Sequence, residues 1–242
     1  MSIAAFAIAS VPDTATTRRL FGLDDLDDKA VSKVLFHRRK QQTGSSEDLR
    51  WDQRAIVGLS LVRQTPGGVD MQTLTADDGD ERTLLDAYYA TVGNHDRLLS
   101  WNGTDKALPL IHFRSLQHAM HQPGYWQRLQ GEWHVDLRAW LCPAAGDMPT
   151  LDETALKLGF PGMRGIGEKQ LYDAWLAGDM EPVRAFTEHA ALNTFLIGLR
   201  WQVLTGLQSA RGATQYADAL RDLLRESRSS HLGAFLSAWG DE

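Results

Sequence analysis

Two β-rich runs in the first third of the chain flank a tight turn. Residues 54–64 and 69–75 are rich in β-branched and apolar side chains, and Thr-Pro-Gly-Gly at 65–68 is a turn sequence. This pattern predicts an antiparallel hairpin. Residues 3–11 before it are small or apolar and end at Pro12-Asp13, which is typical of a buried strand that leaves into a turn. We therefore predict that the first strand pairs with antiparallel partners.

The rest of the chain alternates between helical and strand patterns before it becomes wholly helical. Helical spacing of apolar residues predicts helices at 26–42, 80–92 and 108–121, and strands are predicted at 97–101 and 134–141. Beyond residue 150 the predicted helices are 151–159, 167–179, 180–206, 213–227 and 231–239. This order predicts an α/β fold with a mixed sheet and a helical C-terminal half. Ligand sites of such sheets lie beyond strand ends, here those of 3–11 and 97–101.

Composition excludes several classes of protein. The chain has 242 residues, 43% of them hydrophobic and 23% charged, which suits one sizeable core. It has no apolar run of 18 residues, and its first residues lack the features of a signal peptide, so we expect a cytoplasmic protein without a membrane partner. Cys142 is the only cysteine, which excludes an internal disulfide.

The formal net charge of −6 argues against a general surface for polyanions. A nucleic-acid partner would need a local basic patch, for which the best candidate is His37 to Gly44, "HRRKQQTG". The favoured alternative for this segment is a solvated C-terminal helical turn, where cations are stabilised by the helix dipole.

Several stretches together resemble a known family. They are "FAIASVPD" at 6–13, "WNGTDKALP" at 101–109, "HVDL" at 134–137 and "FTEHAALNT" at 186–194. In this order they resemble the motifs of bacterial predicted 3'-5' exonucleases related to the proofreading domain of B-type DNA polymerases. The resemblance implies a ribonuclease H-like fold of DEDD type, with a mixed five-stranded sheet flanked by helices. It also predicts an exonuclease-like domain at 1–206 and a helical extension at 207–242 packed on it.

The positions that are acidic in that family carry alanine in this chain. Its members hold two Mg²⁺ or Mn²⁺ ions with four carboxylates, and the resemblance places Ala7, Ala9, Ala107 and Ala190 at those positions. Phe186 stands where a tyrosine would help to position the attacking water. Methyl groups supply no metal ligands, so we expect no metal, no cofactor and no ordinary exonuclease activity. Further departures, such as Met163 in place of a lysine, favour natural loss over engineered inactivation.

Other polar residues near the motifs are candidates for a residual site. Possible substitute ligands are Asp105, Asp136, Glu188 and His189, although helical geometry turns Glu188 and His189 away from position 190. Candidates for substrate binding are Trp101, Asn102, Gly103, Lys106 and Asn193. The structural alternative, which is favoured, is that Trp101 packs while Asn102-Gly103 forms a tight turn.

Three functions remain open at this point. The first is a catalytically inactive exonuclease-like module that binds single-stranded nucleic acid or a protein partner. The second is a metal-dependent 3'-5' exonuclease that uses substitute ligands or was inactivated deliberately. The third is a structural or oligomerisation protein, although the sequence predicts no particular oligomeric state. For the first, we expect the face of Ala7 and Ala9 to border a cleft without a catalytic metal, rather than a filled core.

Overall fold

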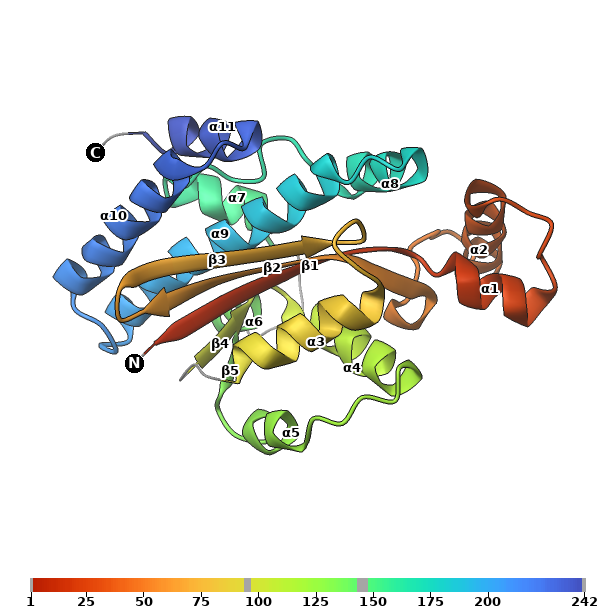
Figure 1. Cartoon of the computed structure of the whole chain (residues 1–242), viewed down its shortest axis with the longest axis horizontal. Coiled ribbons are helices and arrows are strands. Elements are labelled where there is room, and N and C mark those ends of the chain that lie inside the picture. The colour runs from red at the N-terminus through yellow and green to blue at the C-terminus, as the bar shows by residue number, and fades with distance from the viewer. Residues whose placement is uncertain (1, 94–96, 143–147, 241–242) are drawn as a thin grey trace.

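One mixed sheet organises the molecule (Figure 1). The computed structural model describes residues 2–93, 97–142 and 148–240. The strands are β1 Ile3–Pro12, β2 Arg54–Thr65, β3 Gly68–Thr75, β4 Arg97–Ser100 and β5 His134–Asp136, in the order β3-β2-β1-β4-β5. β1 is antiparallel to β2 and parallel to β4, and β4 is parallel to β5. The predicted ribonuclease H-like α/β architecture, with a mixed five-stranded sheet flanked by helices, is confirmed.

Helices cover both faces of this sheet. They are α1 Thr14–Phe21, α2 Asp28–Thr43, α3 Glu81–Val92, α4 Leu108–Gln117, α5 Pro123–Leu129, α6 Leu137–Leu141, α7 Leu151–Lys157, α8 Glu168–Ala177, α9 Glu181–Leu204, α10 Ala210–Glu226 and α11 Ser230–Trp239. A short 3₁₀ helix, Trp51–Gln53, precedes β2, and a π-helical turn, Gly103–Ala107, precedes α4. No helix within the described ranges is long and apolar enough to cross a membrane.

Alternation along β1 divides the core into two layers. Ile3 and Ala5 pack in one cluster with α9 residues such as Phe195, whereas Ala4 and Phe6 pack on the opposite face with residues of α3 and α4. This follows from the period of two in a strand, where successive side chains point to opposite faces. Figure 1 shows α9 along one face and α3 and α4 along the other.

Two predicted elements differ from the structure for local reasons. Residues 134–141 were predicted as one strand, but β5 ends at Asp136 and α6 begins at once. The Asp136 carboxylate accepts hydrogen bonds from the backbone N–H groups of Arg138 and Ala139, which starts a helix. Helix α1 was not predicted, yet Asp13 caps it by accepting from Thr16 N at 2.9 Å. Each helix start depends on the hydrogen bonds of one aspartate, which apolar periodicity does not mark.

The C-terminal helices complete the α9 layer. Leu220 and Leu224 of α10 and Leu232 and Phe235 of α11 belong to the same buried cluster as Ile3 and Ala5. Residues on both sides of position 206 therefore share one core. The boundary at 206 between a domain and an extension stays a prediction.

The close approach of α9 to the sheet depends on Gly198. A Cβ built at this position would lie 2.4 Å from Leu99 Cδ1, and Leu99 is completely buried. We expect Gly198→Ala to lower the free energy of unfolding by about 1–2 kcal/mol, because overpacking outweighs the helix propensity of alanine.

Urea denaturation followed by circular dichroism measures this change, and Gly233→Ala in α11 is the matched control. A Cβ at Gly233 meets nothing within 4 Å, so this variant should gain about 0.5–1 kcal/mol. Equal effects in the two variants would contradict the proposed packing constraint.

Candidate functional site

Ala9 lies in a filled apolar core. It has no exposed surface and packs with Val11, Val57, Leu171, Met180 and Val183, with Trp175 and Phe186 against them. Its partner across β2 is Gly58, where an added Cβ would already come within 3.2 Å of Ala9 Cβ. The expectation that this face borders an open cleft is therefore wrong at Ala9. Ala7, one pleat earlier, is half-buried against the larger cluster beside α9.

The remaining family positions do not form one polar site. Phe186 is partly buried and packs against the same cluster as Ala9. Ala190, one helical turn later on α9, is 7% exposed. Ala107 ends the π-helical turn and packs against the cluster on the opposite face of the sheet, with Ile8. Small and apolar side chains thus occupy every one of the five positions.

Asp136 is held by backbone donors. Its carboxylate accepts from Asn102 N and Thr104 N at 2.9 Å and from Arg138 N at 3.1 Å, and the residue is only 8% exposed. Each oxygen therefore has a partner before any ligand arrives. This arrangement fixes the turn after β4 to the start of α6.

The turn itself explains three of the candidate binding residues. Asn102 has φ +57°, a left-handed conformation that asparagine tolerates, and its side-chain oxygen accepts from Arg138 at 2.7 Å. Gly103 has no room for a side chain, because an added Cβ would lie 2.0 Å from Ser100 Oγ. Trp101 is partly buried and packs against the α9 cluster. These contacts correspond to the structural alternative, a packed tryptophan followed by a tight turn.

A histidine also stabilises this turn. His134 Nε2 lies 2.8 Å from Ser100 Oγ, and burial lowers the pKa of His134 to about 4. The imidazole is therefore neutral at pH 7 and forms one hydrogen bond with the serine hydroxyl.

Lys106, the remaining candidate in this turn, is exposed. Its Nζ lies 3.9 Å from a Glu168 carboxylate oxygen.

Asn193 joins α9 to the loop before α8. Its amide oxygen accepts from Gly162 N at 3.1 Å, and its amide nitrogen donates to Gly162 O at 2.9 Å and to His189 O at 2.7 Å. The side chain is completely buried, and both its oxygen and its nitrogen already have partners. The prediction that Asn193 binds substrate therefore has no geometric support.

Glu188 and His189 contact α11, in addition to being turned away from position 190 as their helical angle predicts. Glu188 lies 2.5 Å from His231 Nε2 of α11, and both side chains are nearly buried. His189 packs against Phe235 of α11, and burial lowers its pKa. Asp105 has a side chain that is 73% exposed and lies 3.9 Å from Arg138. Within the described ranges, no group of three or more His, Cys, Asp or Glu side chains could hold a metal ion.

Sequence reasoning missed a buried ionic cluster at the end of β1. Arg114 of α4 donates to the Asp13 carboxylate and, at 2.7 Å through Nε, to that of Glu81. Glu81 also accepts from Ile56 N at 2.7 Å and lies 3.0 Å from His118 Nε2. Asp13 stands in the motif "FAIASVPD", but its partners are remote in sequence and no local pattern marks them.

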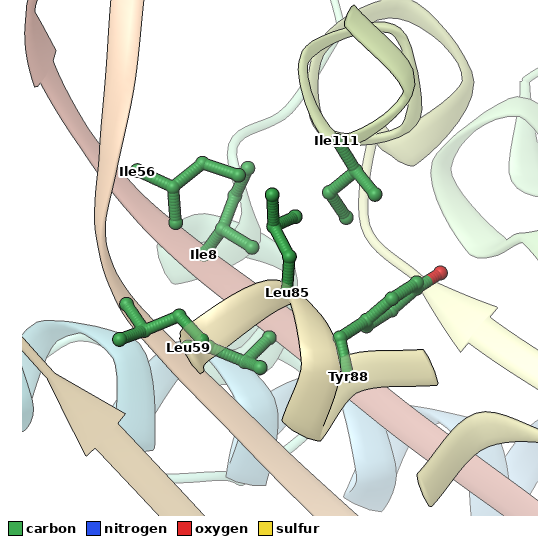
Figure 2. Close-up of a pocket in the computed structure, with 7 residues that line it drawn as sticks. Ile8, Ile56, Leu59, Leu85, Tyr88 and Ile111 are labelled. Carbon is green, nitrogen blue, oxygen red and sulfur yellow. The ribbon is translucent and has the colours of Figure 1, made fainter. Parts of the chain in front are cut away.

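Two pockets flank this region. The larger, of about 310 Å³, lies beyond the end of β1 and is lined by Asp13, Glu81, Arg114 and Trp175 among others. The smaller, of about 10 Å³, is shown in Figure 2 between Ile8, Leu85 and Ile111. Its lining is apolar apart from one tyrosine, and its volume barely admits one water, so it is a packing gap rather than a ligand site. Neither pocket is lined by Ala7 or Ala9.

If Asp136 serves the fold, its replacement must cost stability. Asp136→Asn puts an amide N–H₂ where the carboxylate accepts from backbone donors, so we expect the free energy of unfolding to fall by about 1–3 kcal/mol. Asp105→Asn, an exposed aspartate in the same turn, is the control and should stay within about 0.5 kcal/mol. Urea titration measures both, and an unchanged Asp136→Asn variant would contradict the structural role.

The sequence and the fold were compared with those of known proteins. No curated protein matches the sequence. Among solved structures, the family B DNA polymerase from the hyperthermophilic archaeon Pyrobaculum calidifontis is similar, with a TM-score of 0.51 and 12% sequence identity. The similarity covers 100% of this chain and 27% of the polymerase chain, so it shows a shared fold for a part of that enzyme.

A family match identifies the lineage of the chain. Residues 46–239 match the family described as predicted 3'-5' exonucleases related to the exonuclease domain of PolB. β1, α1 and α2 lie outside the matched residues, so the assignment of Ala7 and Ala9 to acidic positions rests on the motif at 6–13. The match includes Ala107, Phe186 and Ala190 and covers most of the chain. The protein therefore belongs to the family of predicted 3'-5' exonucleases related to the exonuclease domain of PolB.

Proposed function

We propose that this protein is a catalytically inactive exonuclease-like module that binds single-stranded nucleic acid. The observation that carries the proposal is the apolar cluster that contains Ala9 and Phe186. A two-metal nuclease needs several carboxylates around a shared, hydrated space. Here the position is closed by Val57, Leu171, Met180 and Val183. The residues present do not fit two divalent ions, because aliphatic and aromatic side chains supply no oxygen ligands.

The surrounding carboxylates do not replace the four metal ligands of the family. Both oxygens of Asp136 accept from backbone N–H groups, Glu188 is paired with His231, and Asp105 is exposed beside Arg138. Within the part of the chain that the structure describes, none of them belongs to a group of three or more His, Cys, Asp or Glu side chains, and so few ligands bind Mg²⁺ weakly. This argues against the second function, an active exonuclease with rebuilt ligands.

The apolar neighbours also favour natural loss of the site. Replacement of a few acids by an experimenter would leave the polar surroundings of a metal site unchanged. In this chain the side chains around Ala9 are themselves aliphatic or aromatic, and Phe186 joins them. The packing therefore suits alanine better than a carboxylate, as expected if the neighbours changed together with it.

The proposal predicts binding without hydrolysis. Purified protein with a labelled single-stranded oligonucleotide and Mg²⁺ or Mn²⁺ should release no nucleotides, while fluorescence anisotropy should detect complexes that weaken as salt rises. Release of nucleotides that requires Mn²⁺ and stops with a chelator would establish the active exonuclease instead. A stable dimer without affinity for nucleic acid would favour the structural role, and capture of a protein partner without such affinity would favour a protein-binding module.

Restoring an acid at position 9 should damage the fold. Ala9→Glu forces a carboxylate into the apolar cluster, so we expect the free energy of unfolding to fall by about 3 kcal/mol or more. Ala15→Glu is the control, because Ala15 is exposed in the first turn of α1, where a negative charge is tolerated. Thermal and urea denaturation, each with and without Mn²⁺, measure both. Unchanged stability of Ala9→Glu would show that position 9 faces open space.

A further inference from the structure

Helices α1 and α2 form an arm, residues 14–44, at one end of the molecule (Figure 1). The arm begins at Thr14, directly after the carboxyl end of β1. In open α/β sheets this end is where ligands bind. The arm also lies outside residues 46–239, so the family match assigns it no role.

Helix α2 presents a fixed face to solvent. Asp27 caps its start by accepting from Ala30 N at 2.7 Å, and Gly44, in a left-handed conformation, ends it with an N–H donated to Lys40 O at 2.8 Å. Val31, Ser32 and Leu35 are its buried residues. These three positions orient the helix, because they lie on one side of it. The opposite side is therefore held toward solvent.

That exposed side is basic. Lys29, Lys33, His37 and Lys40, which we call the α2 stripe, are all exposed. At about 100° per residue they fall within about 80° of one another around the helix axis. From Lys29 to Ser46 the sequence contains no Asp or Glu, although the whole chain has a net charge of −6. The arm thus concentrates positive charge on an otherwise acidic protein.

Most of the lysine side chains in the α2 stripe are available to bind a ligand. Within the described ranges neither Lys29 nor Lys33 forms an ion pair. Lys40 lies 3.2 Å from a Glu47 carboxylate oxygen, but both side chains are 56% exposed. Exposed pairs of this kind contribute little and are screened by salt, so a polyanion can compete for Lys40.

The dimensions suit a nucleic-acid backbone. Lys40 is eleven positions after Lys29, which corresponds to about 16 Å along the helix at 1.5 Å per residue. The stripe is long enough to span several phosphates of a nucleic-acid strand. The stripe carries cations without a base-reading pocket, so binding should depend on salt and tolerate different sequences.

We propose that the α2 stripe binds the phosphate backbone of a single-stranded nucleic acid at the end of β1. This inference rests on the proposed function and specifies which surface holds the strand. The alternative of an anionic lipid surface is less favoured, although Leu20 and Phe21 of α1 are exposed. The Phe21 ring packs at 3.9 Å from the Arg38 guanidinium, so it is engaged within the arm rather than offered to lipid.

The test compares two triple variants with equal change of charge. Lys29→Gln, Lys33→Gln and Lys40→Gln together remove the stripe. Lys157→Gln, Arg211→Gln and Arg228→Gln remove three exposed cations elsewhere. Affinity for fluorescein-labelled oligo-dT is measured by anisotropy between about 50 and 200 mM salt. We expect the stripe variant to bind about tenfold more weakly and its salt slope to fall by about 2, while the control stays close to the unmodified protein.

The outcomes separate this inference from the proposed function. Oligo-dT binding that is equally weakened or unchanged in both variants overturns the role of the stripe while the proposed function stands. Absence of oligo-dT binding by the unmodified protein overturns both. Binding to phosphatidylserine vesicles that is lost only in the stripe variant, without any oligo-dT binding, also overturns the inference and assigns the stripe to lipid. Circular dichroism of both variants checks that α2 stays folded.

Discussion

Packing of α9 across β1 and β2 is the constraint on which the rest of the structure depends. The helix has 24 residues, and most of them from Val183 to Gln202 are buried. Its close approach to the sheet is possible because Gly198 leaves room for Leu99. Once α9 lies there, Phe186 and Ala190 are fixed near the sheet, and Glu188 and His189 are turned toward α11. The position of this one helix therefore determines which of its polar groups can approach the five family positions.

The polar residues near those positions serve the fold. Asp136 connects the turn after β4 to α6, and Asn193 connects α9 to Gly162. Buried polar groups that lack partners are costly, so each acid or amide retained in a core is expected to be satisfied. Such partners are also what makes these residues unsuitable as metal ligands. Their retention in the core is therefore explained by structural reasons alone.

The Asp13–Arg114–Glu81 cluster connects the end of β1 to helices α3 and α4. Arg114 of α4 pairs with Asp13, which caps α1, and with Glu81, the first residue of α3. Removing one partner from such a cluster leaves a buried charge uncompensated, so the three residues act as a unit. The cluster holds the residue from which the arm begins, because Asp13 directly precedes α1.

The sequence by itself determined most of the elements, the hairpin, the mixed sheet and the chemical character of the five family positions, whereas α1 and the start of α6 were not predicted. These are local properties, because periodicity, turn residues and side-chain type are read over a few neighbouring positions. Only the tertiary structure decided that Ala9 is enclosed by Val57, Leu171 and Met180, and that Asp13 meets Arg114, 101 residues away. Contacts between residues so far apart in the sequence depend on how the helices pack against the sheet. For this reason the alanines at the acidic positions were recognised from the sequence, whereas the closely packed core around Ala9 was not predicted.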